Sequence, residues 1–502
     1  MADKGSTWLN GSGVVTRPDS AAALSSSRGD LIRTMLIAGA ITACSTIFLH
    51  YVPEEWMWES LRIMSVGLVL LGAFYLPRGN PKPAFMIWFI MLIGECIFFR
   101  EGDVNSNANA YAGQFPTAAY GEALAWIMCF LAVLLCSSKV RGFVSDLFKG
   151  DFKWVTFFAL TCLASCAWAP RISLGLVWAF KLLLVTVLLM ACSARIRDYR
   201  DTISFLCYTI WASLIIVLQP VLIAAMRGEM FDEEGRMSTI VSPNALSPNA
   251  AILLLLTLTL FSNRRGEGLK NSAFFVGLTG LLVMILAGSK TGIVACVIAG
   301  TIFYILRGRL GTAFTYVAGT GVLLAILIMA TPLADYAHLY QEREGAESFS
   351  GRTILWKAVM PEIVHKPIQG HGYMSTEFLA FQINAVGWAA PHVHNGFLEA
   401  AYDTGAIGFF FMMAILFVIP RNLYRVLKIM SKDDPIYRVA AGCFALYAFL
   451  VINGFFNSSF GGKCTSPFMV LLGLVVVSQK LKEISEWQLR AVGGLRRVDA
   501  AV

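Results

Sequence analysis

The sequence Pro391-His392-Val393-His394-Asn395-Gly396-Phe397-Leu398-Glu399 lies inside the only long polar interval between hydrophobic segments, which runs from Thr331 to Gly408. Five of the six histidines of the chain fall in this interval. Two further polar motifs precede the histidine motif: Gly351-Arg352-Thr353-Ile354-Leu355-Trp356 and Pro367-Ile368-Gln369-Gly370-His371-Gly372. Because apolar segments flank the interval on both sides, we expect a scaffold that presents it at one surface.

The composition of the chain indicates a membrane protein. Hydrophobic residues make up 57% of the chain and charged residues 14%, whereas a soluble domain carries about a quarter charged residues. Apolar windows of about 18 residues recur, and they lack the alternating polarity of barrel strands. The sequence predicts an all-α, polytopic integral membrane protein with about 12–14 transmembrane helices. The expected spans are residues 33–51, 60–76, 84–99, 118–137, 154–170, 172–193, 202–226, 244–262, 272–288, 290–306, 311–331, 404–420, 438–455 and 466–479.

The distribution of Lys and Arg predicts how these spans are oriented. With a cytoplasmic N-terminus, the cation-rich connections all fall on one side, as the positive-inside rule requires. Both termini are then cytoplasmic, and the large loop lies on the opposite side. The expected divisions are a flexible cytoplasmic leader (1–32), N-terminal transmembrane helices (33–331), a large loop (332–403), C-terminal transmembrane helices (404–479) and a cytoplasmic tail (480–502).

This distribution of cations also explains the net charge of +8, which therefore does not indicate nucleic-acid binding. A transporter is the alternative class. A transporter would be expected to show repeated halves or broken helices around midplane charges, whereas this chain concentrates its polar residues outside the spans.

Four of the cations expected on the side of the large loop are candidates for binding a ligand: Arg171, Arg236, Lys290 and Arg352. An anionic phosphate group would need such partners, since Arg offers a planar fork and Lys a point charge. Each cation taken alone also fits a structural role, in which it reaches lipid phosphates or pairs with a nearby carboxylate. Arg236 precedes the polar break Val241-Ser242-Pro243-Asn244, and Lys290 lies in a tight hairpin, so the two together suit a pyrophosphate site at the membrane surface.

His394 is the candidate proton acceptor. It precedes Asn395 and an apolar stretch, Gly396 to Tyr402, that is expected to begin a helix and so to fix the imidazole in place. His392 lies two residues earlier, but no spacing of Cys, His or carboxylate residues completes a tetrahedral metal site. We therefore predict no metal and no cofactor.

The order of these motifs resembles the O-antigen ligase and polymerase superfamily. The resemblance covers about residues 230–420: the polar break with Arg236 and Pro243-Asn244, the Gly288-Ser289-Lys290-Thr291-Gly292 hairpin, the three loop motifs, and Thr404-Gly405-Ala406-Ile407-Gly408 opening a span. No single motif is specific; their order around one large loop is.

The resemblance implies a metal-independent membrane glycosyltransferase in a bacterial inner membrane, with the large loop periplasmic. Its donor would be an undecaprenyl-pyrophosphate-linked glycan, and its acceptor a hydroxyl of a second glycan or of lipid A core. His394 looks like the loop histidine of the family, Arg236 like an arginine that binds the donor pyrophosphate, and Lys290 like the second cation, where the family often has Arg. Arg352 is expected to assist at the pyrophosphate, with supporting roles for Asn244, His371, Asn395 and Glu399.

Among the members of the superfamily, the histidine motif looks most like the exopolysaccharide type. The sequence therefore favours a polysaccharide polymerase, of exopolysaccharide or O-antigen, with an O-antigen ligase as the alternative. A flippase or transporter of lipid-linked glycan remains the alternative of another class.

Overall fold

The computed structural model describes residues 81–98, 145–227, 231, 237, 243–261, 270–330, 352–377 and 392–499. These residues form a bundle of helices, and the sole β-type pairing among them is an isolated bridge between Phe231 and Met237. The prediction of an all-α membrane protein is confirmed. In chain order the elements are α3 (Pro81–Phe98), α7 (Lys153–Ser165), the 3-10 helix η2 (Cys166–Trp168), α8 (Ile172–Arg195), α9 (Tyr199–Arg227), α10 (Pro243–Phe261), α11 (Lys270–Leu286), α12 (Lys290–Leu306), α13 (Leu310–Ala330), α15 (Arg352–His365), α17 (Gly396–Ile429), α18 (Pro435–Phe456) and α19 (Ser466–Asp499).

Apolar runs determine where these helices lie. Within the described residues, five helices are long and apolar enough to cross a membrane, and shorter apolar helices accompany them. The span expected at 290–306 is α12, with the same bounds. The spans expected at 33–51, 60–76 and 118–137 lie outside the described residues. The five long helices cover Ile172–Arg195, Tyr199–Leu222, Pro243–Leu260, Gly396–Ile429 and Pro435–Phe456.

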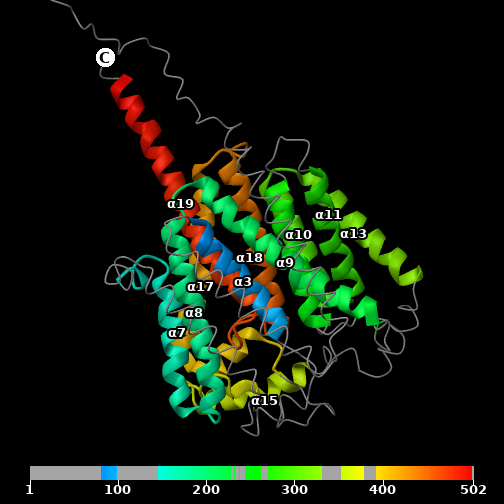
Figure 1. The fold of residues 1–502 in the computed structure, drawn as a ribbon, viewed down its shortest axis with the longest axis vertical. Helices are drawn as coiled ribbons and strands as arrows, with labels where there is room; N and C mark the ends of the chain where they lie inside the picture. The colour runs from blue at the N-terminus through cyan, green and yellow to red at the C-terminus, as the bar shows by residue number, and fades with distance from the viewer. Residues whose placement is uncertain are drawn as a thin grey trace, which may run out of the picture.

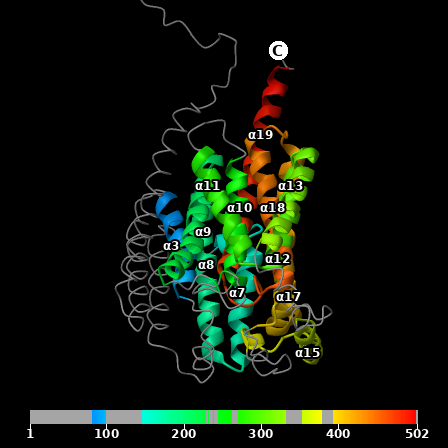
Figure 2. The same ribbon diagram turned by 90° about the vertical axis from the view of Figure 1, so that its right-hand side faces the viewer.

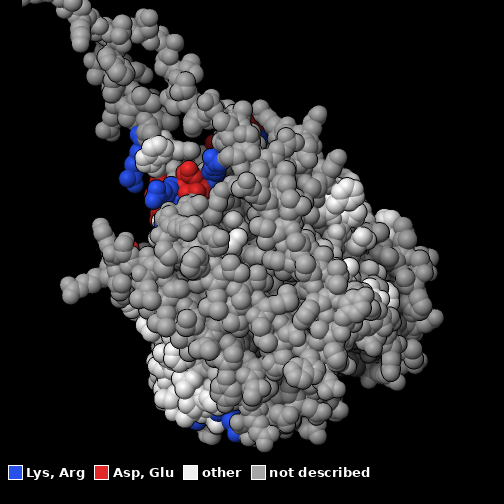
Figure 3. All heavy atoms as spheres, viewed as in Figure 1, with Lys and Arg blue, Asp and Glu red and all other residues white. Residues whose placement is uncertain are grey.

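The bundle has two distinct ends, which are visible in Figures 1 and 2. At the α15 end lie α15 itself and the turns that enter α8, α12 and α19. At the opposite end, the α19 end, α19 emerges toward the C-terminus. On the face shown in Figure 3, the described charged side chains gather mainly where α19 emerges. The turns that carry many of the predicted cytoplasmic cations thus share one end of the bundle.

A central element of the bundle is α17, which packs against α7, α15, α18 and α19. It is kinked at Gly405, whose φ of 61° is a left-handed value that favours glycine. A side chain there would also collide with the preceding loop, since a Cβ on Gly405 would lie 2.2 Å from the carbonyl oxygen of Ile368. Because of the kink, the 366–372 loop packs directly against α17 at the α15 end of the bundle.

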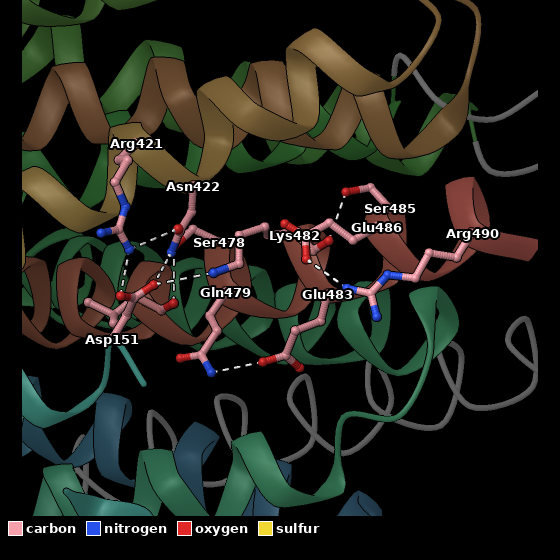
Figure 4. Close-up of polar contacts among 11 residues, drawn as sticks. Asp151, Arg421, Asn422, Ser478, Gln479, Lys482, Glu483, Ser485, Glu486 and Arg490 are labelled. Atoms are coloured by element: carbon pink, nitrogen blue, oxygen red, sulfur yellow. Dashed lines mark hydrogen bonds and ion pairs between the residues drawn. The ribbon is translucent and has the colours of Figure 1, made fainter. Parts of the chain in front are cut away.

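A polar cluster fastens the α19 end, as Figure 4 shows. Asp151, just before α7, accepts hydrogen bonds from Arg421 (2.5 Å) and Asn422 (2.8 Å) of α17, and Lys482 of α19 lies 3.6 Å away. Burial alone would raise the pKa of Asp151, but these hydrogen bonds and charges lower it overall. The cluster joins three segments that are remote in sequence.

Candidate functional site

The motif that contains the two neighbouring histidines forms a fixed turn at the start of α17. Asn395 caps the helix: its side-chain oxygen accepts from the backbone N–H groups of Phe397 (3.0 Å) and Leu398 (3.1 Å). His394 has a φ of 56°, an uncommon conformation for a residue other than glycine. The indole Nε1 of Trp356 on α15 donates to the carbonyl oxygen of Val393 at 3.0 Å. The backbone on either side of His394 is therefore held in place by hydrogen bonds at Val393 and Asn395.

The rings of His392 and His394 are in contact, with centroids 3.9 Å apart at an interplanar angle of 75°. The side chain of His394 is buried, with 7% of its surface exposed. Burial, followed by the nearby positive charge of Arg352, lowers the pKa of His394 to about 3. Burial likewise lowers the pKa of His392 well below its usual range, with His394, Lys463 and Arg352 adding to the effect. The lowered pKa keeps His394 a neutral imidazole near pH 7 and makes it a weaker base than an ordinary histidine.

This environment predicts an unusual pH dependence. A neutral imidazole accepts a proton only above its pKa, so activity that depends on His394 should stay constant between about pH 5 and pH 8, where an ordinary histidine would titrate near 6.5. Arg352→Gln removes a positive charge that disfavours the imidazolium, so the loss of activity on acidification should move to higher pH. The measurement is the transfer rate against pH for both proteins. An inflection near pH 6.5 in the unmodified protein would contradict this picture.

Arg352, the first residue of α15, links two other elements to the histidines. Its guanidinium donates to Thr291 Oγ1 at 3.3 Å and to Asn457 Oδ1 at 3.4 Å. Thr291 follows Lys290, and the Lys290 side chain is exposed at the start of α12. The predicted cations Lys290 and Arg352 therefore lie at the same end of the bundle as His394.

The turn between α18 and α19 was missing from the sequence prediction, yet it belongs to this site. Asn457 is buried and donates through Nδ2 to Asn453 Oδ1 at 2.9 Å, while its own oxygen receives Arg352. Further along, the carbonyl oxygen of Gly462 accepts from the hydroxyl of Tyr373 at 2.7 Å. The available signal was Lys463, a cation in a connection that is expected on the same side as the large loop.

Lys463 forms an ion pair with Glu377, with Nζ and Oε1 2.7 Å apart and both side chains largely buried. The same ammonium lies 5.8 Å from the ring centroid of Trp178 on α8. Its charge also contributes to the lowered pKa of His392. Lys463 and Arg352 thus both act on the electrostatics of the histidine pair.

Glu399, in the first turn of α17, forms hydrogen bonds with the backbone of the histidine motif and with the turn after α18. Its buried carboxylate accepts a short hydrogen bond from Ser458 Oγ and another from the backbone N–H of Val393. The peptide units around Val393 are therefore held by both Trp356 and Glu399.

We expect Glu399→Ala to lower the transfer rate by about tenfold to a hundredfold, because a small displacement of a catalytic group is costly. Glu399→Gln keeps an acceptor oxygen and should retain most of the activity. The rate should be compared with the thermal unfolding midpoint of each variant. Equal losses in the two variants would show that an amide cannot replace the carboxyl group in these hydrogen bonds.

His371 lies apart from this cluster. Its ring stacks on Tyr402 with centroids 4.2 Å apart, and its Nε2 lies 2.9 Å from the carbonyl oxygen of Glu362. Next to Tyr402, the buried Asp403 accepts hydrogen bonds from the N–H groups of Met374 (3.0 Å) and Thr376 (2.7 Å). Both residues hold the 371–376 loop against α17. No local motif around Asp403 indicated this role.

Asn244 and Arg236 are the remaining predicted residues. Asn244 is exposed at the start of α10. Arg236 lies outside the described residues; its neighbour Met237 donates its N–H to the carbonyl oxygen of Leu286, just before the turn to α12. Across the described part of the chain, no three His, Cys, Asp or Glu side chains are grouped so as to hold a metal ion.

Part of the chain matches a known family of proteins. Residues 274–413 match the family model described as O-antigen ligase, and this segment includes Lys290, Arg352 and His394. None of the curated proteins compared with the chain matches it. The family match confirms, over residues 274–413, the resemblance of this membrane protein to the O-antigen ligase and polymerase superfamily.

Proposed function

We propose that the protein transfers a polyisoprenyl-pyrophosphate-linked glycan to an acceptor hydroxyl on the periplasmic face of a bacterial inner membrane, as a polysaccharide polymerase. The observation that carries the proposal is the meeting of a neutral, buried His394 with Arg352 and the start of α12 at one end of a membrane bundle. The family match over the same residues supports it.

The chemistry needs a proton acceptor and a stabiliser of negative charge. The acceptor oxygen attacks the anomeric carbon, the bond from that carbon to the phosphate oxygen breaks, and polyisoprenyl pyrophosphate departs. His394 takes the hydroxyl proton. Lys290, Arg352 and Arg236 stabilise the charge that develops on the leaving phosphates. Because pyrophosphate is already a good leaving group, orientation and charge stabilisation supply most of the catalysis.

The role of Lys290 is tested by exchanging its charge and its shape separately. Lys290→Ala should lower the transfer rate by about tenfold to a hundredfold, since it removes one charge stabiliser. Lys290→Arg should keep or raise the rate, because it preserves the charge and adds a bidentate fork. Lys366→Ala, which removes another exposed cation outside the cluster, is the matched control. Unchanged rates in Lys290→Ala would remove this residue from the proposal.

Ligase activity is the second candidate, favoured by the description of the matching family. Purified full-length protein given lipid-linked glycan, with and without lipid A core, separates the possibilities. Longer chains on the same lipid identify a polymerase, and glycan joined to lipid A core identifies a ligase. The absence of any covalent change would favour transport and overturn both.

A further inference from the structure

A second group of cations gathers at the α19 end, far from the histidines. The turn between α12 and α13 contains Arg307, Gly308 and Arg309, and the turn between α17 and α18 brings Lys432 against it. A Cβ built on Gly308 would lie 3.2 Å from Lys432 Nζ, so the two turns touch. Arg438, in the first turn of α18, completes a group that we call the basic corner: Arg307, Arg309, Lys432 and Arg438.

A hydrogen bond and a small apolar core join the helices beneath the basic corner. The hydroxyl of Tyr437 donates to the carbonyl oxygen of Leu306 at 2.7 Å and so joins α18 to the end of α12. Below this bond, Phe303, Tyr437, Ala441 and Ala445 form a small apolar core of their own. The guanidinium of Arg307 lies 5.5 Å from the centroid of the Phe303 ring. The backbone positions of the four cations are therefore fixed by the packing of α12 against α18.

Two carboxylates lie in the same turn as Lys432, namely Asp433 and Asp434, so the four cations of the corner remain in excess. Asp434 caps α18 by accepting a hydrogen bond from the N–H of Ile436 at 2.7 Å. Among the described residues, the ion pair found there joins Arg438 Nη2 to Asp433 Oδ1 at 3.8 Å, and the Asp433 side chain is 99% exposed. Arg438 Nε is buried and has no hydrogen-bond partner in the described part of the chain. Burial, and then the charges of Arg309 and Arg438, lower the pKa of Arg307, which reflects the crowding of like charges. An anion placed here would relieve that repulsion.

An exposed apolar surface begins directly beside the corner. Leu310 and Phe314, on the first turns of α13, are 67% and 77% exposed, and Ile305 at the end of α12 is also exposed. A phosphate bound by the cations would thus adjoin a surface suited to acyl chains. A free phosphate ion would make no use of that surface.

We propose that the basic corner binds the phosphate headgroup of an anionic phospholipid, with the acyl chains lying along Ile305, Leu310 and Phe314. The charge distribution predicts that this end faces the cytoplasm, where the leaflet carries anionic lipids. The site is separate from the histidine cluster and does not depend on the proposed transfer reaction.

The experiment uses the purified, delipidated full-length protein exposed to an equimolar mixture of phosphatidylglycerol and phosphatidylcholine, with the retained lipid counted by native mass spectrometry. The unmodified protein should retain phosphatidylglycerol preferentially. Arg309→Gln combined with Lys432→Gln should lower that preference by about tenfold or more, because each Lys or Arg near an anionic lipid surface strengthens binding by about fivefold. Both side chains are exposed, so the variant should keep its thermal midpoint, and Lys432→Gln alone should give a smaller loss.

Arg490→Gln is the matched control, because Arg490 is an exposed cation at the same end that pairs with Glu486 instead. It should retain lipid as the unmodified protein does. Equal retention of the two lipids by the unmodified protein, or an unchanged preference in the double variant, overturns the proposal. Complete displacement of phosphatidylglycerol by millimolar inorganic phosphate would assign the corner to a free anion and overturn the lipid assignment.

Discussion

His394→Ala should abolish glycan transfer, with a loss of about a hundredfold to ten-thousandfold, the range typical of a positioned general base. The neutral imidazole is buried beside His392. Burial and the positive charge of Arg352 lower its pKa to about 3. Transfer is measured as glycan extension by purified protein supplied with lipid-linked glycan.

The backbone of His394 calls for a second variant. Its φ of 56° disfavours alanine by about 1–2 kcal/mol, whereas asparagine tolerates this conformation well. His394→Asn therefore keeps the turn but removes the base, and it should lose as much activity as His394→Ala while unfolding at the temperature of the unmodified protein. His365→Ala, an exposed histidine at the end of α15, should leave the rate within about twofold. Substantial activity in His394→Asn would refute the role of the imidazole.

Arg352→Ala should lower the transfer rate by about a hundredfold or more, as removal of a well-placed charge stabiliser does. Arg352→Lys should recover only part of this, because lysine keeps the charge but cannot reach Thr291 and Asn457 together. The rate and the KM for the lipid-linked donor are measured for both. Lys357→Ala removes an exposed cation from the same helix and serves as the control for net charge.

Arg352 could instead act solely as a clip between α12 and the turn after α18. Asn457→Ala and Thr291→Val each remove one hydrogen-bond partner and leave the cation in place. If the guanidinium acts on the substrate phosphates, both variants should lose far less activity than Arg352→Ala. Losses as large as that of Arg352→Ala would assign Arg352 a structural role.

Local sequence was enough to place several of the described helices and the start of α17. Apolar runs predict where helices lie, and the bounds of α12 matched those expected for the run at 290–306. Asn395 is a favourable helix cap, and its position after His394 located the helix start that holds the imidazole. These features depend on neighbours within a few residues.

The turn after α18 was beyond such reasoning, because its contacts join residues far apart in sequence. Arg352 and Asn457 are 105 residues apart, and Glu399 and Ser458 are 59 apart. Hydrophobic periodicity identifies which segments are helices, but not which turns meet at one end of the bundle. His371 shows the converse limit: it lies in the polar interval with the other histidines, yet its ring packs on Tyr402.

The contacts of Asn457 and Ser458 also determine when, during synthesis of the chain, the surroundings of His394 are completed. A chain is made from its N-terminus, so Arg352, His394 and Glu399 emerge from the ribosome well before the turn that holds two of them in place. A nascent chain that has inserted α17 but not yet α18 has its imidazole without the groups that fix its surroundings. The last helical hairpin therefore completes the surroundings of the imidazole late in synthesis, when Asn457 and Ser458 reach Arg352 and Glu399.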